Sequence, residues 1–126
     1  MTECIIRENF IVKRDKETGK VCFDINFKKL SGHKLTIQEY KKYLEDNLRY
    51  TDWNSDPLFT VTIQPKDIVR VTVNSRDCHF NQMDSGRDVY ITALENPSKR
   101  IFTLYLREYD NRVHMDIDIS VKKLIL

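Results

Sequence analysis

Apolar residues recur at every second position through most of this chain, and this alternation constrains the fold more than any other feature of the sequence. The clearest case is segment 21–27, which reads Val21, Cys22, Phe23, Asp24, Ile25, Asn26 and Phe27. Successive side chains of a β-strand point to opposite faces, so a period of two gives one buried and one solvated face. The chain is therefore predicted to consist mostly of antiparallel strands.

Six further segments are predicted to be strands; five show the same alternation, and the first, 6–12, shows it more loosely. Their apolar positions define the ranges 6–12, 59–63, 69–73, 89–93, 102–106 and 115–121. Polar segments with turn-forming residues separate them. The longest of these polar segments runs from Ser75 to Asp88. It is predicted to be an irregular loop, and long loops carry function more often than short ones.

One segment has a helical period instead. Thr36 and Glu39 have the spacing of a capping box, in which each side chain accepts a hydrogen bond from the other residue's amide. Apolar residues then recur at three- and four-residue steps, at Ile37, Tyr40, Leu44 and Leu48. A helix is therefore predicted from Thr36 to near Tyr50.

These elements predict an α+β fold in the order β-β-α-β-β-β-β-β, with an antiparallel sheet of about seven strands curled over one helix. A small β-barrel plugged by the helix is the alternative. The chain has 126 residues, a length that fits one domain spanning residues 1–126.

The last three predicted strands agree on one register. A two-residue turn at 110–111 pairs Tyr109 with Arg112, and a four-residue turn at 96–99 pairs Glu95 with Arg100. Counting back from these turns opposes apolar residues, in the pairs Leu106–Met115, Leu104–Ile117, Phe102–Ile119, Ala93–Phe102, Ile91–Leu104 and Val89–Leu106. A slip of one residue would place leucines against aspartates, so the buried face selects this register.

The polar side of the same strands forms three cross-strand rows: Asp88, Arg107 and His114; Tyr90, Tyr105 and Asp116; and Thr92, Thr103 and Asp118. Exposed tyrosine and arginine are enriched among the residues that dominate binding between proteins. The candidate partner-binding residues are therefore Tyr90, Tyr105, Arg107, His114 and Asp116. The alternative is ordinary cross-strand pairing on a solvated face, in which each pair contributes about 0.2–1 kcal/mol.

The sequence has no motif typical of a catalytic, cofactor or metal site, and none is predicted. Its three glycines, Gly19, Gly32 and Gly86, are far apart, which excludes glycine-rich phosphate-binding loops. The cysteines and histidines lack the spacing of a zinc site. Cys78 beside His79 offers a nucleophile and a base, but no flanking motif supports that pairing.

The charge distribution argues against a dedicated nucleic-acid binder. Lys and Arg number 21 against 19 Asp and Glu, and the basic residues are scattered rather than clustered. Segment 105–109 interleaves aromatic and basic residues, which suits base stacking. Asp116 and Asp118 are predicted on the same face, where they would repel phosphates. Nucleic-acid binding by this sheet face is kept as an alternative function.

Cysteine use and hydropathy predict a cytoplasmic protein without a membrane partner. The cysteines are odd in number and form no CxxC pair, as expected in a reducing compartment; they are Cys4, Cys22 and Cys78. No apolar run approaches the roughly 20 residues that a membrane helix needs. The apolar C-terminal residues are predicted to pack on the core, with a contact to a second copy or a partner as the alternative; they are Leu124, Ile125 and Leu126.

Together these observations favour a non-enzymatic domain that binds another protein. The abundance of Ile, Lys, Asn, Asp and Tyr is typical of an AT-rich coding genome. With the small size, this suggests an inhibitor or regulator of a larger protein, carried by a bacterium or a phage. A small enzyme whose site is assembled from residues far apart in the sequence is a third hypothesis. No pattern in the sequence identifies the partner.

Overall fold

The structure, a computed structural model, describes residues 4–51, 55–75, 77–82, 88–95, 100–109 and 112–121. Within these residues the chain is mostly strand, and the predicted α+β class is confirmed. The strands are β1 (Cys4–Ile6), β2 (Phe10–Arg14), β3 (Val21–Asn26), β4 (Phe59–Gln64), β5 (Ile68–Val73), β6 (Asp77–Gln82), β7 (Val89–Glu95), β8 (Arg100–Tyr109) and β9 (Arg112–Val121). The α-helix is α1 (Ile37–Asn47), and a 3₁₀ turn spans Phe27–Lys29.

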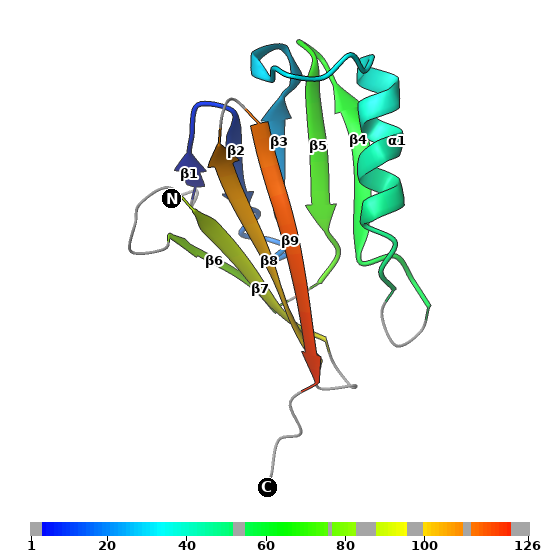
Figure 1. Cartoon of the computed structure of the whole chain (residues 1–126). Coiled ribbons are helices and arrows are strands. Elements are labelled where there is room, and N and C mark those ends of the chain that lie inside the picture. Colours follow the sequence, from blue (N-terminus) through cyan, green and yellow to red (C-terminus); the bar gives the residue numbers. More distant parts are fainter. Residues whose placement is uncertain are drawn as a thin grey trace, which may run out of the picture.

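The strands form two antiparallel sheets (Figure 1). One sheet has five strands in the order β1-β2-β3-β5-β4, and the other has four in the order β6-β7-β8-β9. The prediction of about seven strands in one sheet did not anticipate β1, β6 or this division. Each sheet ends in edge strands within the described ranges, so the alternative of a closed barrel around the helix is wrong.

Part of the stretch 75–88, predicted to be an irregular loop, is the strand β6, so that prediction is wrong for Asp77–Gln82. Cys78 is fully buried opposite Ala93, and Phe80 is half-buried opposite Ile91. Only two inward positions of this strand are apolar, and one of them is a cysteine. The alternation was therefore too short to stand out from the polar residues around it.

One cluster of buried side chains joins the inner faces of the two sheets. Its fully buried members come from both, and include Val12, Phe23, Val71, Cys78, Ile91 and Leu104. β6 lies against β2 and β3, where Arg14 Nε donates to the Cys78 carbonyl at 3.0 Å. Burying each large apolar side chain stabilises the fold by about 1.5–3 kcal/mol, so this shared core holds the two sheets together.

The capping box predicted at the start of α1 is confirmed. The Thr36 hydroxyl accepts from the Glu39 amide at 3.1 Å, and the Glu39 carboxylate accepts from the Thr36 amide at 2.9 Å. The helix buries Tyr40 and Leu44 and ends at Asn47, slightly before the predicted end. In the described part of the chain, no helix combines the length and apolar character that crossing a membrane requires.

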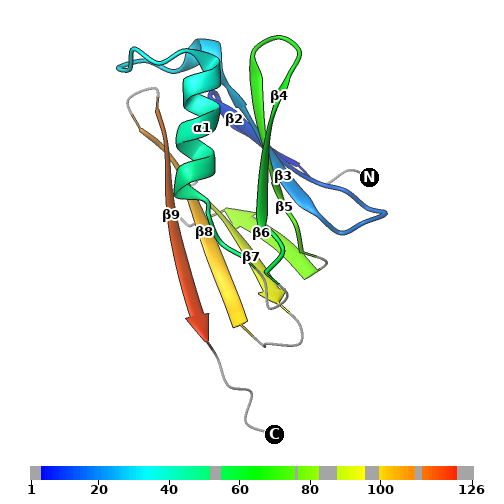
Figure 2. The same cartoon turned by 90° about the vertical axis from the view of Figure 1, so that its right-hand side faces the viewer.

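The helix lies along the open side between the sheets, beside β4 and β9 (Figure 2). Arg112, at the start of β9, donates to the carbonyls of Ser31 at 3.2 Å and Gly32 at 2.8 Å. Gly32 has a φ of +78°, a conformation that favours glycine, and a Cβ there would displace the Arg112 guanidinium. These contacts fasten the segment before α1 to the four-stranded sheet.

Candidate functional site

The register predicted for the last three strands is confirmed. β7 pairs with β8, and β8 with β9, at every residue pair named above, including Tyr90 opposite Tyr105 and Arg107 opposite His114. The inner positions of β7 and β8 are buried, namely Val89, Ile91, Ala93, Leu104 and Leu106. A one-residue slip would turn these side chains to solvent, so the core determines the register.

The outer side of the four-stranded sheet brings together the predicted site residues that the structure describes. We name it the tyrosine face, formed by His79, Asn81, Asp88, Tyr90, Thr92, Thr103, Tyr105 and Arg107. The sequence prediction missed the two residues from β6 because it treated that strand as loop. Asp116 occupies the register position opposite Tyr105, and His114 the position opposite Arg107. Their side chains lie outside what the structure describes.

The centre of the tyrosine face is an aromatic pair beside an ion pair. The rings of Tyr90 and Tyr105 have centroids 6.5 Å apart and an interplanar angle of 44°. Both side chains are half-buried. Arg107 Nε donates to Asp88 Oδ2 at 3.2 Å, and the Arg107 side chain is 57% exposed. An open sheet face with aromatic and charged rows suits contact with another macromolecule more than enclosure of a small ligand.

The outer side of the five-stranded sheet has a different polar centre. Asp24 on β3 is only 8% exposed and accepts from Arg70 Nε at 2.7 Å, Arg70 Nη2 at 3.1 Å and Lys13 Nζ at 3.0 Å. Burial by itself would raise the pKa of Asp24, but the hydrogen bonds from Arg70 and Lys13 outweigh it and hold this pKa below its usual value. The hydrogen bonds within this cluster occupy the Asp24 carboxylate and connect β2, β3 and β5, so the cluster is structural.

The thiols of Cys22 and Cys78 do not support nucleophilic catalysis. The three cysteines are free, with Cys78 fully buried and Cys22 half-buried. Burial raises the pKa of both Cys22 and Cys78, which disfavours the reactive thiolate. The Cys78 thiol donates to the Ser75 carbonyl at 3.2 Å. Among the described residues, no three His, Cys, Asp or Glu side chains gather closely enough to hold a metal ion.

His33, another candidate base, belongs to an aromatic cluster. Its ring lies 5.1 Å from that of Phe27 and 6.0 Å from that of Tyr40, measured between centroids. Its Nδ1 accepts from the Leu35 amide at 3.2 Å. A small cavity of ≈ 200 Å³ adjoins this cluster, between α1 and Arg112 of β9. These contacts place His33 in the packing between the helix and β9, with its Nε2 buried and without a hydrogen-bond partner.

A larger hollow lies between α1 and β4, and the sequence did not predict it. We name it the edge groove; it has a volume of ≈ 780 Å³ and lies between Lys42 and Asp46 of α1, Arg49 just after the helix, and residues 59–62 of β4. The apolar periodicity of the sequence predicted the helix and the strand 59–63 separately, but not that they lie side by side. Their proximity depends on how the two sheets bury each other, which no local pattern encodes.

Comparison of the chain with models of protein families, with curated proteins and with solved structures finds no match. Its function is therefore argued from its own residues. Two surfaces qualify on their chemistry: the tyrosine face, which the sequence predicted in part, and the edge groove, which it did not.

Proposed function

We propose that this chain is a non-enzymatic protein-binding domain whose tyrosine face contacts the partner. The observation that supports this most is the adjacency of Tyr90 and Tyr105 beside the exposed Arg107. Tyrosine and arginine are enriched among the residues that contribute most to binding between proteins. A tyrosine side chain buries a large area while losing few rotatable bonds, so its entropic cost on binding is small.

The position of the two tyrosines lowers that cost further. β7 and β8 are the inner strands of their sheet, with β6 and β9 paired outside them. Each ring is half-buried against its neighbour before any partner binds. A surface that is already ordered has less freedom to lose on association, which favours affinity.

The charges on this face favour protein over nucleic acid. Asp88 pairs with Arg107, and the register aligns Asp116 with Tyr105 and Asp118 with Thr103. Carboxylates in these rows offset the positive potential that phosphate binding needs. The enzyme hypothesis has no group of described residues in its favour.

Within this proposal the chain acts in the cytoplasm as an inhibitor or regulator of a larger protein of bacterial or phage origin. Three free thiols suit a reducing compartment. A small chain with an ordered binding face can act by covering a surface of a larger protein. The mixed charges would add specificity, since like charges on a wrong partner are repelled.

The test is quantitative affinity capture from a lysate of the source organism, with partners identified by mass spectrometry. Tyr105→Ala and Arg107→Ala are each expected to abolish capture of the specific partner. Tyr43→Ala is the matched control, because it removes a tyrosine that is 54% exposed on α1, away from this face. It is expected to retain the partner.

Two further readouts separate the alternatives. Denaturant melts should show that both face variants stay folded, with losses of no more than about 1 kcal/mol. Retained capture by both variants would mean that the tyrosine face is only a solvated sheet surface. Capture that disappears after nuclease treatment would support the nucleic-acid alternative instead.

A further inference from the structure

The edge strands of the two sheets differ in how they discourage pairing with another chain. An edge strand presents a row of main-chain N–H and C=O groups, which proteins shield by short length, charge or cover. β1 has three residues, β6 lies against β2 and β3, and β9 contains charged residues along its sequence. β4, with the sequence FTVTIQ, has six residues, no charge and four β-branched side chains. It is the longer of the two uncharged edge strands among the described residues, and α1 packs beside it.

The direction of the main-chain groups of β4 follows from its pairing with β5. β4 runs antiparallel to β5 with Phe59 opposite Val73, which places Leu58 opposite Asn74. The Asn74 amide donates to the Leu58 carbonyl at 2.7 Å. Antiparallel ladders alternate, so Thr60 and Thr62 direct their main-chain groups to β5, and Val61 and Ile63 direct theirs to the outer edge.

The helix turns this edge into one wall of the edge groove. Lys42 and Asp46 are four residues apart and share one side of α1, and Arg49, just after the helix, contacts Asp46 on the same wall. On the strand, Thr60 and Thr62 are exposed and Val61 is buried. An extended segment added to such an edge gains affinity from main-chain hydrogen bonds and specificity from the side chains beside it.

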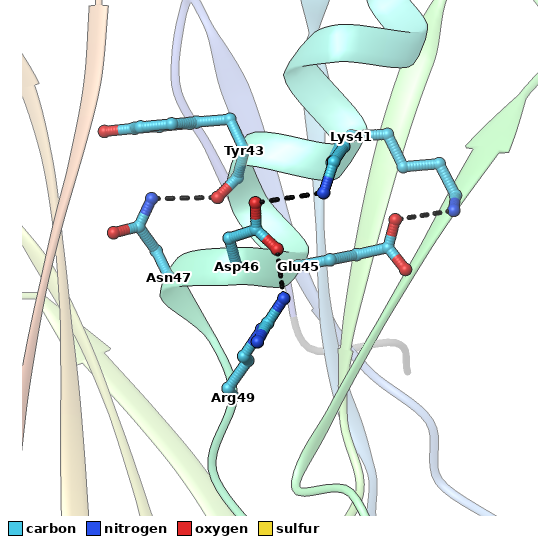
Figure 3. Close-up of polar contacts among 7 residues, drawn as sticks. Lys41, Tyr43, Glu45, Asp46, Asn47 and Arg49 are labelled. Atoms are coloured by element: carbon cyan, nitrogen blue, oxygen red, sulfur yellow. Dashed lines mark hydrogen bonds and ion pairs between the residues drawn. The ribbon is translucent and has the colours of Figure 1, made fainter.

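The helix wall of the groove carries an excess of positive charge. Asp46 accepts from Arg49 at 2.7 Å and from Lys42 at 3.4 Å (Figure 3 draws the contact with Arg49). Both cationic side chains are 74% exposed, and they share a single carboxylate. Glu45, the other acid on this wall, pairs with Lys41 at 2.8 Å. An acidic side chain in the occupant would complement Lys42 and Arg49.

A second copy of the chain fits the edge groove less well than a different polypeptide. Antiparallel pairing of β4 with itself about a two-fold axis would also set α1 antiparallel to α1 of the second copy. In the register that brings the two helices together at Asp46, Lys42 would approach Arg49 of the second copy, and the two Asp46 carboxylates would approach each other. This meeting of like charges favours a partner segment of opposite charge.

We propose that the edge groove binds an extended, acidic segment of a partner protein by β-strand addition to β4. Val61 and Ile63 exchange main-chain hydrogen bonds with the segment, while Lys42 and Arg49 contact its acidic side chain. This surface is separate from the tyrosine face, and neither proposal depends on the other.

The probe for this proposal is a library of random peptides displayed on phage and selected on the intact, immobilised chain. Enriched peptides should alternate apolar with polar residues and contain Asp or Glu. The most enriched sequence is then synthesised with a fluorescent label, and its affinity is measured by anisotropy. Its binding should weaken as salt concentration rises.

The main-chain part of the proposal is tested with a matched pair of variants. Ile63→Pro removes an N–H that faces the outer edge and leaves the ladder with β5 intact, a position where an edge strand tolerates proline. Its peptide affinity should fall about fivefold or more, as expected for one lost main-chain hydrogen bond. Ile63→Val keeps the N–H and should bind the peptide as the native chain does.

The charge part is tested with a second pair. Arg49→Glu should weaken peptide binding about tenfold, because it replaces an attractive charge with a repulsive one. Lys28→Glu reverses an equally accessible charge, 71% exposed on the 3₁₀ turn, and should leave binding unchanged.

Amide exchange tests the main-chain part even if Ile63→Pro does not fold. Peptide binding to the native chain must then slow the amide exchange of Val61 and Ile63 more than that of Thr60 and Thr62.

Each of the following outcomes would overturn the proposal. One is that the selection enriches no peptide, or that the enriched peptide binds the native chain and folded Ile63→Pro equally. Another is that peptide binding protects the amides along β4 equally. A third is that the native chain forms a dimer that Ile63→Pro dissociates, which would mean that a second copy occupies the groove. Peptide binding that Tyr105→Ala abolishes and Ile63→Pro does not would also overturn it, while supporting the tyrosine face.

Discussion

The outer side of each sheet carries an ion pair between a carboxylate and an arginine, but the two pairs differ in how many of their hydrogen-bonding groups are already used. Each has a carboxylate beside an arginine, Asp24 with Arg70 on the five-stranded sheet and Asp88 with Arg107 on the four-stranded sheet. Asp24 accepts three hydrogen bonds and is nearly buried, whereas Asp88 accepts one from an arginine that is mostly exposed. The first cluster is closed and structural, and the second leaves most of its guanidinium available to a partner.

The strand order explains this difference. β3 is the central strand of its sheet, so Asp24 receives a cation from each neighbour, Lys13 on β2 and Arg70 on β5. Asp88 stands just before β7 and meets one cation, from β8. An ion pair with a full set of partners stabilises a sheet, while one with unused donors remains able to bind.

The largest expected effect comes from breaking the closed cluster. Asp24→Ala would leave the Arg70 and Lys13 cations without their carboxylate, and it should lower the free energy of unfolding by about 2–3 kcal/mol. Urea melts followed by circular dichroism measure this change. A loss below about 0.5 kcal/mol, the range of an exposed pair, would contradict the distinction between the two sheets.

The pH dependence of stability sharpens the same distinction. The pKa of Asp24 is lowered in the folded chain, so its stabilising effect is complete above its unfolded value of about 4. That effect is lost as the pH falls through the lower folded pKa, because the unfolded chain binds the proton first. The stability gap between the native chain and Asp24→Asn should therefore narrow on acidification below about pH 4. Urea melts of both proteins across this range measure it; a constant gap would contradict the prediction.

A smaller effect is expected at the centre of the tyrosine face. Tyr105→Ala should cost about 1 kcal/mol, because it removes one ring of a half-buried aromatic pair. Tyr105→Phe keeps the ring and should unfold at nearly the same denaturant concentration as the native chain. A loss as large as that of Asp24→Ala would mean that this face, too, is mainly structural.

The smallest effect is expected from the open ion pair. Asp88→Ala should change the free energy of unfolding by about 0.5 kcal/mol. The Asp88 side chain is only 16% exposed, but its one partner, Arg107, is 57% exposed and keeps water as an alternative partner. Thermal and urea melts of this variant beside Asp24→Ala measure the contrast directly. Equal losses in the two variants would show that the number of cation partners does not separate the two clusters.

The candidate site was predictable where local rules agree. Turn lengths and apolar matching predicted Tyr90 opposite Tyr105 and Arg107 opposite His114, and the structure has both pairs. His79 and Asn81 were missed because their strand has too few apolar positions to reveal its period. Whether Tyr90, Tyr105, Arg107, His114 and Asp116 bind a partner stays a prediction.

By itself the sequence determined the local elements of this protein: period two made the strands, the Thr36–Glu39 box began the helix, and short turns set the register of β7, β8 and β9. Three features depend on the tertiary structure alone. β3 pairs with β5, β6 packs against the other sheet at Cys78, and α1 lies beside the edge of β4. Neighbouring residues select local geometry through sterics and hydrogen bonds. Contacts between distant segments are selected by which combination of faces buries the most apolar surface, a property of the whole chain.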